Sequence, residues 1–345
     1  MANRAAYLIA AKARPLVIRD APMPTPEHDQ IVVKVGAVAI NPVDAGIQNA
    51  GIIVEEFPSV IGVDMAGEVT AIGADVEHLK VGDRVLASAD SNPGDKVLNG
   101  SFQYYTTTHH KMAAKIPDSV SYTDSCVLPL AMATAATALF DKRCMGLDLP
   151  RIGSKSNGLT LVVWGGASSV GSCGIQAARA AGYNVITTAS KKNFEYCRAL
   201  GVEEIFDYND VDVVEQIVMY MQGKKSAGVF DAVMPPESIL ACNVIAHRSD
   251  GFKHVGTVLP EPFPLPEGRP SDVTTSYNWG SWLKENEVGD AVWVDWIPQA
   301  LADGSLKCKP DAHIVGKGLD DIQGAIDLYA KGGISATKLV VDFVQ

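Results

Sequence analysis

The chain has 345 residues, of which 47% are hydrophobic and 20% charged, and its formal net charge is −11. This length suits about two domains, and the composition excludes wholesale disorder. A surface this acidic repels phosphate backbones, so we expect neither a nucleic-acid partner nor an anionic membrane partner. The six cysteines form no C-x-x-C pair, and the first residues lack the apolar region of a signal peptide. Both features predict a cytoplasmic protein with reduced thiols.

The first part of the chain is predicted to be rich in β-strands. Residues 31–39 (IVVKVGAVA) are β-branched and alternate, and similar short runs follow at 67–72, 83–87 and 104–108. Glycines separate these runs, which is typical of tight turns in a small barrel. The apolar run 127–140 contains Pro129 and is too short to cross a bilayer, so we predict a buried helix there.

After about residue 125 the pattern changes to alternating strands and helices. Residues 159–164 (LTLVVW) form a continuous apolar run, which suits a strand buried on both faces of a parallel sheet. Alternation of this kind calls for right-handed βαβ units. We predict further strands at 183–188, 204–206, 228–233, 252–258, 273–277 and 338–343, and helices at 170–181, 193–200, 213–221, 291–303 and 319–331.

A glycine-rich turn joins the apolar strand to the Ala-rich helix. It reads Gly165-Gly166-Ala167-Ser168-Ser169-Val170-Gly171. Glycines allow the backbone to approach a diphosphate closely, and the free N–H groups at a helix start attract that anion. Between a buried strand and a helix, this turn predicts a dinucleotide-binding site.

The end of the second strand predicts which dinucleotide binds. Enzymes specific for NAD place Asp or Glu there, to bind the ribose 2′-hydroxyl. This chain has Ser190-Lys191-Lys192-Asn193 and no acid at that point. Serine and lysine attract a 2′-phosphate that a carboxylate would repel, so we expect NADPH as the cofactor.

The chain resembles the medium-chain dehydrogenase/reductase superfamily over nearly its whole length. The glycine turn carries the resemblance together with the segments 39–44 (AINPVD), 58–69 (PSVIGVDMAGEV), 81–85 (VGDRV), 128–131 (LPLA) with Thr134, and 332–341 (GGISATKLVV). Within the superfamily it is most similar to zinc-free, quinone oxidoreductase-like members, and closest to the fungal trans-acting enoyl reductases. Segments 189–193 (ASKKN) and 200–208 (LGVEEIFDY) are typical of that branch.

The resemblance implies an α/β fold with two domains. A β-rich, GroES-like catalytic domain would comprise residues 1–125 and 300–345, and a Rossmann NADPH-binding domain with a doubly wound parallel sheet would comprise residues 126–299. It also implies cofactor contacts from Gly165, Gly166, Ala167, Ser168, Ser169, Val170, Ser190, Lys192, Asn193, Tyr208, Thr257 and Lys338. The candidate catalytic residues are Asn41, Asp44 and Thr134, although Asp44 has an alternative role in capping the helix after Pro42.

No metal site is expected. Zinc-dependent relatives supply Cys and Gly-His-Glu where this chain has Asn41 and Gly62-Val63-Asp64, and Asn and Val are not zinc ligands. The four-cysteine structural lobe of those relatives is also missing between residues 87 and 102. Many zinc-free relatives carry a lysine two residues after Asp44, where this chain has Gly46, so the general acid is unassigned.

The expected reaction is hydride transfer from NADPH to an activated C=C bond, as in an α,β-unsaturated carbonyl compound, or to a quinone. Two alternatives stay open, a zinc-independent carbonyl or alcohol dehydrogenase and a non-catalytic NADPH-binding regulatory protein. The aromatic-rich segment 276–282 suits an apolar or aromatic small-molecule substrate or, equally, packing at a domain junction. A carrier protein of a synthase is a further candidate partner, and we expect a monomer or a homodimer.

Overall fold

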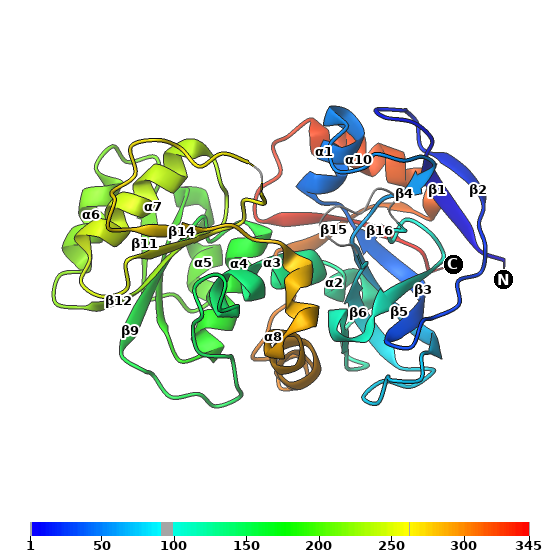
Figure 1. The fold of residues 1–345 in the computed structure, drawn as a ribbon, viewed down its shortest axis with the longest axis horizontal. Coiled ribbons are helices and arrows are strands. Elements are labelled where there is room, and N and C mark those ends of the chain that lie inside the picture. The colour runs from blue at the N-terminus through cyan, green and yellow to red at the C-terminus, as the bar shows by residue number, and fades with distance from the viewer. Residues whose placement is uncertain (1, 91–98, 262, 345) are drawn as a thin grey trace. The chain divides into compact units, whose positions relative to one another are not determined.

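The computed structural model describes residues 2–90, 99–261 and 263–344. Part of the segment 87–102, where the sequence lacks the cysteine lobe, therefore lies outside the described residues. The chain divides into two compact units, of which the first comprises Met1–Leu130 and Trp293–Gln345 and the second Ala131–Val292. The first unit is thus built from both ends of the chain, and the second from its middle (Figure 1).

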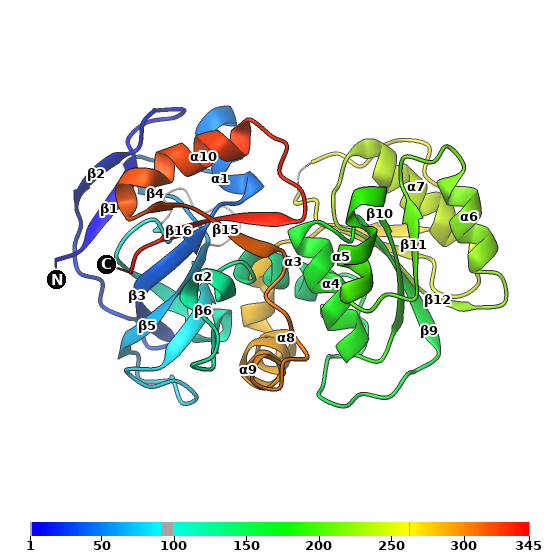
Figure 2. The ribbon, with the colours of Figure 1, turned by 180° about the vertical axis from the view of Figure 1, so that it is seen from behind.

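The first unit is rich in β-strands. Its described residues form a seven-stranded sheet in the order β15-β16-β3-β5-β6-β8, with β7 paired to β3, and a three-stranded sheet β2-β1-β4. Figure 2 shows β3, β5 and β6 side by side in the larger sheet. The strands are β1 (Arg4–Leu8), β2 (Val17–Asp20), β3 (Gln30–Ala39), β4 (Ser59–Val60), β5 (Asp64–Ile72), β6 (Arg84–Ser88), β7 (Tyr105–His109), β8 (Ala113–Lys115), β15 (Asp311–Lys317) and β16 (Thr337–Asp342), and the helices are α1 (Pro42–Ala50), α2 (Tyr122–Ser125), α9 (Ile297–Ala302) and α10 (Ile322–Ala330).

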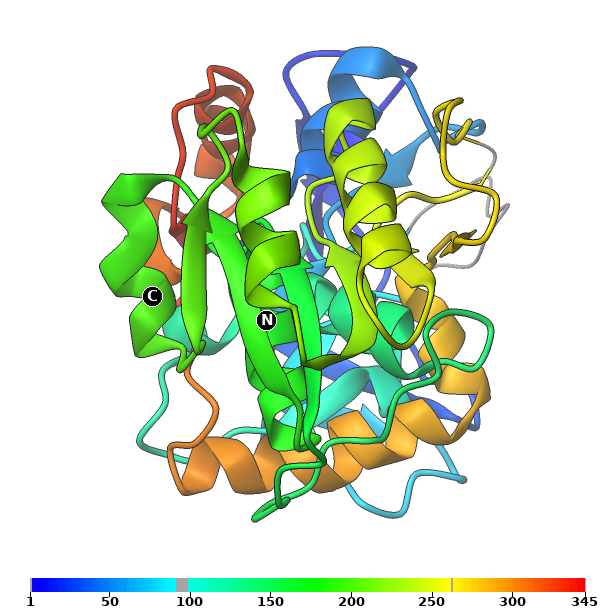
Figure 3. The same ribbon diagram turned by 90° about the vertical axis from the view of Figure 1, so that its left-hand side faces the viewer.

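The second unit contains a parallel sheet. Its described strands lie in the order β11-β10-β9-β12-β13-β14, and each adjacent pair is parallel. Helix α4 packs against β9 and β10, and α7 packs against β12 and β13 (Figure 3). The strands are β9 (Leu159–Trp164), β10 (Asn184–Ala189), β11 (Glu204–Asp207), β12 (Lys225–Asp231), β13 (His254–Thr257) and β14 (Thr274–Ser276), and the helices are α4 (Ser169–Ala180), α5 (Phe194–Ala199), α6 (Val213–Tyr220), α7 (Pro236–Arg248) and α8 (Glu287–Gly289).

The strand order reverses beside β9. The chain first runs outward through β10 and β11, and then returns to the other side of β9 with β12. In open α/β sheets, ligands bind outside the carboxyl ends of the strands at such a reversal, because the connections leave it uncovered. The sheet therefore points to the end of β9 as the place to look for a binding site.

The predicted strands of both units are confirmed to within a few residues, and so is the predicted α/β class with a doubly wound parallel sheet. The prediction missed helix α7 entirely. It also expected one helix over 291–303, where the chain forms a π-helix at Asp290–Trp296 followed by α9. Trp293 and Trp296 are buried, so these two aromatic side chains pack in the core.

The apolar run before residue 140 is mostly buried. Helix α3 spans Pro129–Phe140, one turn after α2. By length and composition alone, Tyr122–Phe140 is apolar enough to cross a membrane, but 78% of it is buried inside the protein. Buried core helices meet the same criteria of length and hydropathy as membrane-spanning helices. The prediction of a buried helix is therefore confirmed from Pro129 onward.

Candidate functional site

The glycine turn directly follows β9. Gly165 has φ +85°, a conformation that L side chains rarely adopt, and α4 begins at Ser169. The hydroxyl of Ser168 caps this helix by accepting a hydrogen bond from the N–H of Gly171 at 2.9 Å. A Cβ at Gly171 would lie 2.3 Å from the carbonyl oxygen of Gly165, so only glycine lets the helix start so close to the strand.

The start of α4 presents free backbone donors. Within the described ranges, the N–H groups of Ser169 and Val170 have no hydrogen-bond partner, and both residues are only partly buried. The first N–H groups of any helix lack an intrahelical acceptor, and they carry partial positive charge. These donors fit the diphosphate of a dinucleotide, which supplies the oxygens that they lack.

The end of β10 lies beside the end of β9 in the parallel sheet. Ser190 follows β10 directly, and Lys191 and Lys192 are both exposed. Lys191 forms ion pairs with Asp207 (3.7 Å) and Asp210 (3.8 Å). Lys192 has neither an ion pair nor a side-chain hydrogen bond among the residues that the structure describes. Lys192 is therefore the lysine whose charge is available to an anion here.

The carboxylate nearest to these lysines is already bound. Asp207 accepts hydrogen bonds from the backbone N–H of Asn209 (3.0 Å) and from its side-chain amide (2.8 Å). The Asn209 backbone bond, helped by the side chains of Asn209 and Lys191, lowers the pKa of Asp207 against the opposing effect of desolvation. With Lys191 beside it, this carboxylate does not leave an unbalanced negative charge next to Ser190.

Most of the other predicted cofactor residues lie at the same edge of this sheet, whereas Lys338 belongs to β16 of the first unit. Asn193 donates a hydrogen bond to the Ser190 hydroxyl at 3.4 Å, and Tyr208, which follows β11, is 45% exposed. Thr257 ends β13 and is buried. Thr134, predicted as a catalytic residue, lies on α3, and its backbone carbonyl accepts a hydrogen bond from the side-chain amide of Asn278 at 2.8 Å. The residues predicted to bind the cofactor in this unit thus follow or end the strands β9, β10, β11 and β13.

The first unit holds a buried polar cluster, formed by Asn41, Asp64 and Lys338. The Lys338 ammonium donates to the Asn41 side-chain oxygen at 2.5 Å and lies 3.0 Å from the Asp64 carboxylate. The Asn41 amide donates to the same Asp64 oxygen at 2.9 Å. The other Asp64 oxygen accepts the N–H of Leu130, in the first turn of α3, at 2.6 Å. A buried charge needs such partners, and Asp64 has three of them.

Asp64 is the member of this cluster that sequence reasoning did not single out. It stands at the start of β5, directly before the buried Met65 and Ala66. A single acidic residue within a sequence that predicts a buried strand indicates a buried charge. Such a residue could have been singled out from the sequence, because a buried carboxylate requires a partner. The sequence did predict a role for Lys338, but at the cofactor. The structure shows its side chain bound to Asn41 and Asp64.

Asp44 caps helix α1, as the alternative prediction proposed. Its Oδ2 accepts the backbone N–H of Asn41 at 2.7 Å, whereas its Oδ1 is buried without a partner among the described residues. Desolvation by burial raises the pKa of Asp44 from 3.8 to about 7, against the lowering effect of the Asn41 hydrogen bond. Asp64 raises this pKa further and Lys338 lowers it. Asp44 therefore changes charge near neutral pH, within the same cluster.

Gly46, two residues after Asp44, is closely covered. Its missing Cβ would lie 3.1 Å from the terminal methyl carbon of Ile52. The space beside this position is thus taken by an apolar side chain, and the cation that acts on the neighbouring Asp44 is Lys338.

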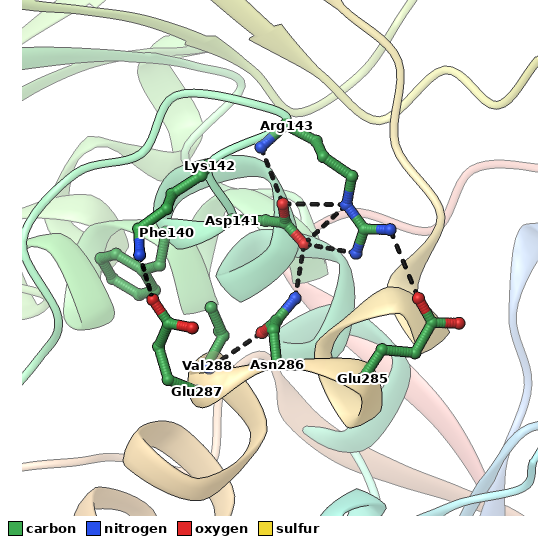
Figure 4. Close-up of a pocket in the computed structure, with 8 residues that line it drawn as sticks. All are labelled: Phe140, Asp141, Lys142, Arg143, Glu285, Asn286, Glu287 and Val288. Carbon is green, nitrogen blue, oxygen red and sulfur yellow. Dashed lines mark hydrogen bonds and ion pairs between the residues drawn. The ribbon is translucent and has the colours of Figure 1, made fainter.

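A pocket of about 200 Å³ in the second unit has a different character (Figure 4). Asp141 at its centre accepts hydrogen bonds from Arg143 (2.7 Å) and Asn286 (2.8 Å), and Arg143 also pairs with Glu285. Burial alone would raise the pKa of Asp141, but the hydrogen bonds from Arg143 outweigh it and lower this pKa. Because these charges bind one another, we assign the pocket a structural role.

Comparison with known proteins places the chain in a family. Residues 27–118 match the alcohol dehydrogenase GroES-like domain, and residues 169–266 match the zinc-binding dehydrogenase domain. The chain is 39% identical to the zinc-binding alcohol dehydrogenase domain-containing protein cipB of Emericella nidulans, over 98% of both chains. It is 37% identical to the trans-enoyl reductase himH of Aspergillus japonicus, over 99% of this chain and 97% of that one. It is 30% identical to the lovastatin nonaketide synthase enoyl reductase component lovC of Aspergillus terreus, over 93% and 91%.

Solved structures agree on the fold. An alcohol dehydrogenase superfamily protein from Novosphingobium aromaticivorans superposes with a TM-score of 0.79 at 23% identity, over 99% of this chain and 100% of that one. The CurK enoyl reductase superposes with a TM-score of 0.74 at 19% identity, over 99% of both chains.

The fold and these matches define an oxidoreductase of the medium-chain dehydrogenase/reductase superfamily. Within it, the chain belongs to the family that includes fungal dehydrogenases and trans-enoyl reductases, and its two units carry that family's GroES-like domain and inserted Rossmann sheet. Members of this superfamily bind nicotinamide cofactors, so the predicted dinucleotide class is confirmed.

Gly171→Ala should abolish dinucleotide binding, because the added Cβ would collide with the Gly165 carbonyl and displace the start of α4. Fluorescence titration of the cofactor checks this. The matched control is Gly324→Ala on α10, where a Cβ would meet nothing within 4 Å. That change should leave cofactor binding intact and stabilise the fold by up to about 1 kcal/mol, as alanine does in helices. Equal binding by both variants would contradict the assignment of the turn.

The raised pKa of Asp44 should make stability depend on pH. Between about pH 4 and about pH 7 the folded chain keeps a proton that the unfolded chain has released, so the free energy of unfolding falls as pH rises. The Asp44 contribution to this slope is at most about 1.4 kcal/mol per pH unit. Asp44→Asn should remove it, and urea unfolding at a series of pH values measures the difference. Parallel pH profiles for the two proteins would refute the shift.

Proposed function

We propose that the protein is an NADPH-dependent reductase that transfers a hydride, without a metal, to the activated C=C bond of an α,β-unsaturated carbonyl compound or to a quinone. The observation that supports NADPH most directly is Lys192, whose ammonium has no partner in the described part of the chain and stands just after β10. The family supports the reaction class.

The electrostatics at the end of β10 favour an extra phosphate. A phosphate ester brings close to two negative charges, and Ser190 and Lys192 can donate to its oxygens. Lys191 is held by Asp207 and Asp210, so it offers less. NADH would leave Lys192 with no anion to bind, and would find no carboxylate in the segment 190–193 to accept its ribose hydroxyl.

The residues at the strand ends fit a dinucleotide in other respects. The N–H groups of Ser169 and Val170 would bind the diphosphate, and Asn193 and Tyr208 would lie around the adenosine phosphate together with Ser190. Thr257 and Thr134 are proposed along the nicotinamide side. When bound, the reduced nicotinamide supplies the hydride, and the protein contributes binding and orientation.

Metal-free chemistry is supported by the buried cluster of the first unit. There the Asn41 amide, the Asp64 carboxylate and the Lys338 ammonium interact with one another. The positive charge beside Asn41 and Asp64 is therefore the Lys338 ammonium. No three His, Cys, Asp or Glu side chains gather in a metal-binding arrangement within residues 2–90, 99–261 and 263–344. Reduction of a conjugated C=C bond suits such a site, because the carbonyl group of the substrate delocalises the charge.

The names of the relatives bear on the substrate. The relatives from Aspergillus japonicus and Aspergillus terreus are a trans-enoyl reductase and an enoyl reductase component of a synthase, so reduction of C=C bonds is the leading assignment. An apolar or aromatic small molecule, alone or on a carrier protein, remains the predicted substrate. The cytoplasmic location and the monomeric or homodimeric state are likewise predictions.

Lys192→Ala should weaken NADPH binding and leave NADH binding nearly unchanged, because it removes a charge that only the phosphate uses. One hydrogen bond to a charged group contributes about 1.5–3 kcal/mol, so the dissociation constant should rise by roughly one to two orders of magnitude. Lys191→Ala is the matched control and should change NADPH binding much less, since Lys191 is engaged by Asp207 and Asp210. Equal losses in the two variants would sink the assignment.

An assay with NADPH and matched substrates tests the reaction. An aromatic enone should be reduced at its C=C bond, and the corresponding saturated ketone should not be consumed. Consumption of the ketone alone would favour a carbonyl dehydrogenase. Tight NADPH binding without turnover of enones, quinones or aldehydes would favour a regulatory role instead.

A further inference from the structure

A pair of hydroxyl groups, from Ser172 and Tyr196, connects the glycine turn to helix α5. Ser172 lies in the first turn of α4 and is fully buried, and its hydroxyl donates a hydrogen bond to the carbonyl oxygen of Gly166 at 3.0 Å. The Tyr196 hydroxyl lies 2.8 Å from the Ser172 hydroxyl. Ser172 has one hydroxyl proton and gives it to the carbonyl, so Tyr196 is the donor to Ser172. The hydroxyl pair thus forms a chain of hydrogen bonds from α5 through α4 to the turn.

This chain of hydrogen bonds runs between the two anion sites that an NADPH-binding protein requires. The glycine turn and the start of α4 carry the backbone donors that fit the diphosphate. Lys192 lies in the 3₁₀ helix Lys191–Asn193, which continues directly into α5. Tyr196 follows Lys192 by four residues on this continuous helical segment. The segment that bears the free lysine is therefore joined to the turn that would hold the diphosphate.

Apolar packing explains the ring of Tyr196 but not its hydroxyl. The ring packs against a small buried cluster of Ala189, Cys197 and Ile205, and Ala167 of the glycine turn packs against the same cluster. A phenylalanine ring has the same shape and would make the same apolar contacts. What the hydroxyl adds is the bond to Ser172.

Other hydrogen bonds fix the turn to the sheet and the two helices to each other. The N–H groups of Gly165 and Gly166 donate to the hydroxyl and to the carbonyl oxygen of Thr188, at 3.0 and 2.9 Å, which holds the turn on β10. Near the C-terminal ends of α4 and α5, the Arg179 guanidinium donates to the carbonyl oxygen of Leu200 at 3.1 Å. The hydroxyl pair joins the same two helices at their N-terminal ends, where the groups for the ligand lie.

We propose that Tyr196 is a positioning residue, whose hydroxyl sets the spacing between the diphosphate site and the 2′-phosphate site and thereby contributes to the preference for NADPH. This inference rests on the proposed function and adds to it a specificity determinant that does not touch the ligand. A ligand that carries both anionic groups gains from a fixed spacing, because binding of one group then holds the other at its own site. A ligand with only one of these groups gains nothing from it.

Adenosine phosphates test the proposal, because they separate the two sites. The ligand 5′-AMP carries only the phosphate that belongs to the diphosphate, 2′-AMP carries only the extra phosphate, and 2′,5′-ADP carries both. Tyr196→Phe should leave the dissociation constants of both monophosphates within about twofold and raise that of 2′,5′-ADP by roughly three- to tenfold, the size of one hydrogen bond's net contribution. NADPH should lose affinity in the same proportion, and NADH much less. Calorimetric titration of the full chain measures each dissociation constant.

Tyr183→Phe is the matched control. The Tyr183 hydroxyl accepts the backbone N–H of Asp148 at 3.0 Å, and Tyr183 directly precedes β10, at the amino end of the sheet. Each variant loses one hydrogen-bonded phenol hydroxyl, so urea unfolding should show similar losses of stability for the two. Only Tyr196→Phe should change the affinity for 2′,5′-ADP. A Tyr196→Phe protein that loses stability but binds 2′,5′-ADP like the wild type would reduce the hydroxyl to a structural role and overturn the proposal.

The remaining outcomes separate this inference from the proposed function. Equal losses of affinity for 2′-AMP, 5′-AMP and 2′,5′-ADP in Tyr196→Phe would also overturn the role in spacing, and would leave the NADPH assignment in place. A wild-type protein that reduces neither enones nor quinones would refute the proposed reaction, while the titrations would still decide the role of Tyr196. A wild-type protein that binds NADPH no more tightly than NADH would refute the cofactor assignment and this inference with it.

Discussion

The reversal of strand order beside β9 is the constraint on which the cofactor site depends. The carboxyl ends of β9 and β10 lie next to each other because these two strands pair in parallel, and the chain then returns to the other side of β9 with β12, so that the connections diverge there. The glycine turn after β9 and Ser190 after β10 are thereby brought together. Lys191 is paired with Asp207 and Asp210, whereas Lys192 has no partner among the described residues. This difference matters for cofactor binding because both lysines follow β10 directly, beside the glycine turn.

A second interaction, the ion pair between Lys338 and Asp64, organises the first unit in a comparable way. It connects the last strand of the chain with β5, and Asn41 bridges the two charged groups. A buried pair of this kind is weak evidence for stability, because desolvation offsets much of the attraction. What the pair does within the first unit is to hold Asn41, Asp64 and Lys338 in fixed positions relative to one another.

Much of the fold was predictable, because short-range patterns carry it. The apolar run of β9 and the glycines after it mark a buried strand and a βα turn without any knowledge of the partners. Helix α7 escaped prediction although it begins at Pro236, and proline in the first turn is a recognised start signal. The π-helix at Asp290–Trp296 leaves no distinct period in so short a segment.

The cofactor residues could be named from the sequence because they follow strands directly. The partner of Lys338 could not, since Asp64 lies far away in the chain and only the antiparallel pairing of β16 with β3, and of β3 with β5, brings the two together. The sequence also could not predict which of Lys191 and Lys192 forms ion pairs, because the acidic partners are distant in the chain. Asp207 and Asp210 approach Lys191 only because β11 pairs with β10.

The account depends most on the available positive charge after β10, and the dissociation constants of NADPH and NADH for the wild-type protein, measured by calorimetric titration at one salt concentration, test it most directly. We predict that NADPH binds more tightly by roughly two orders of magnitude, the equivalent of about 3 kcal/mol from charge-assisted hydrogen bonds to the additional phosphate. Equal affinities, or tighter binding of NADH, would contradict it.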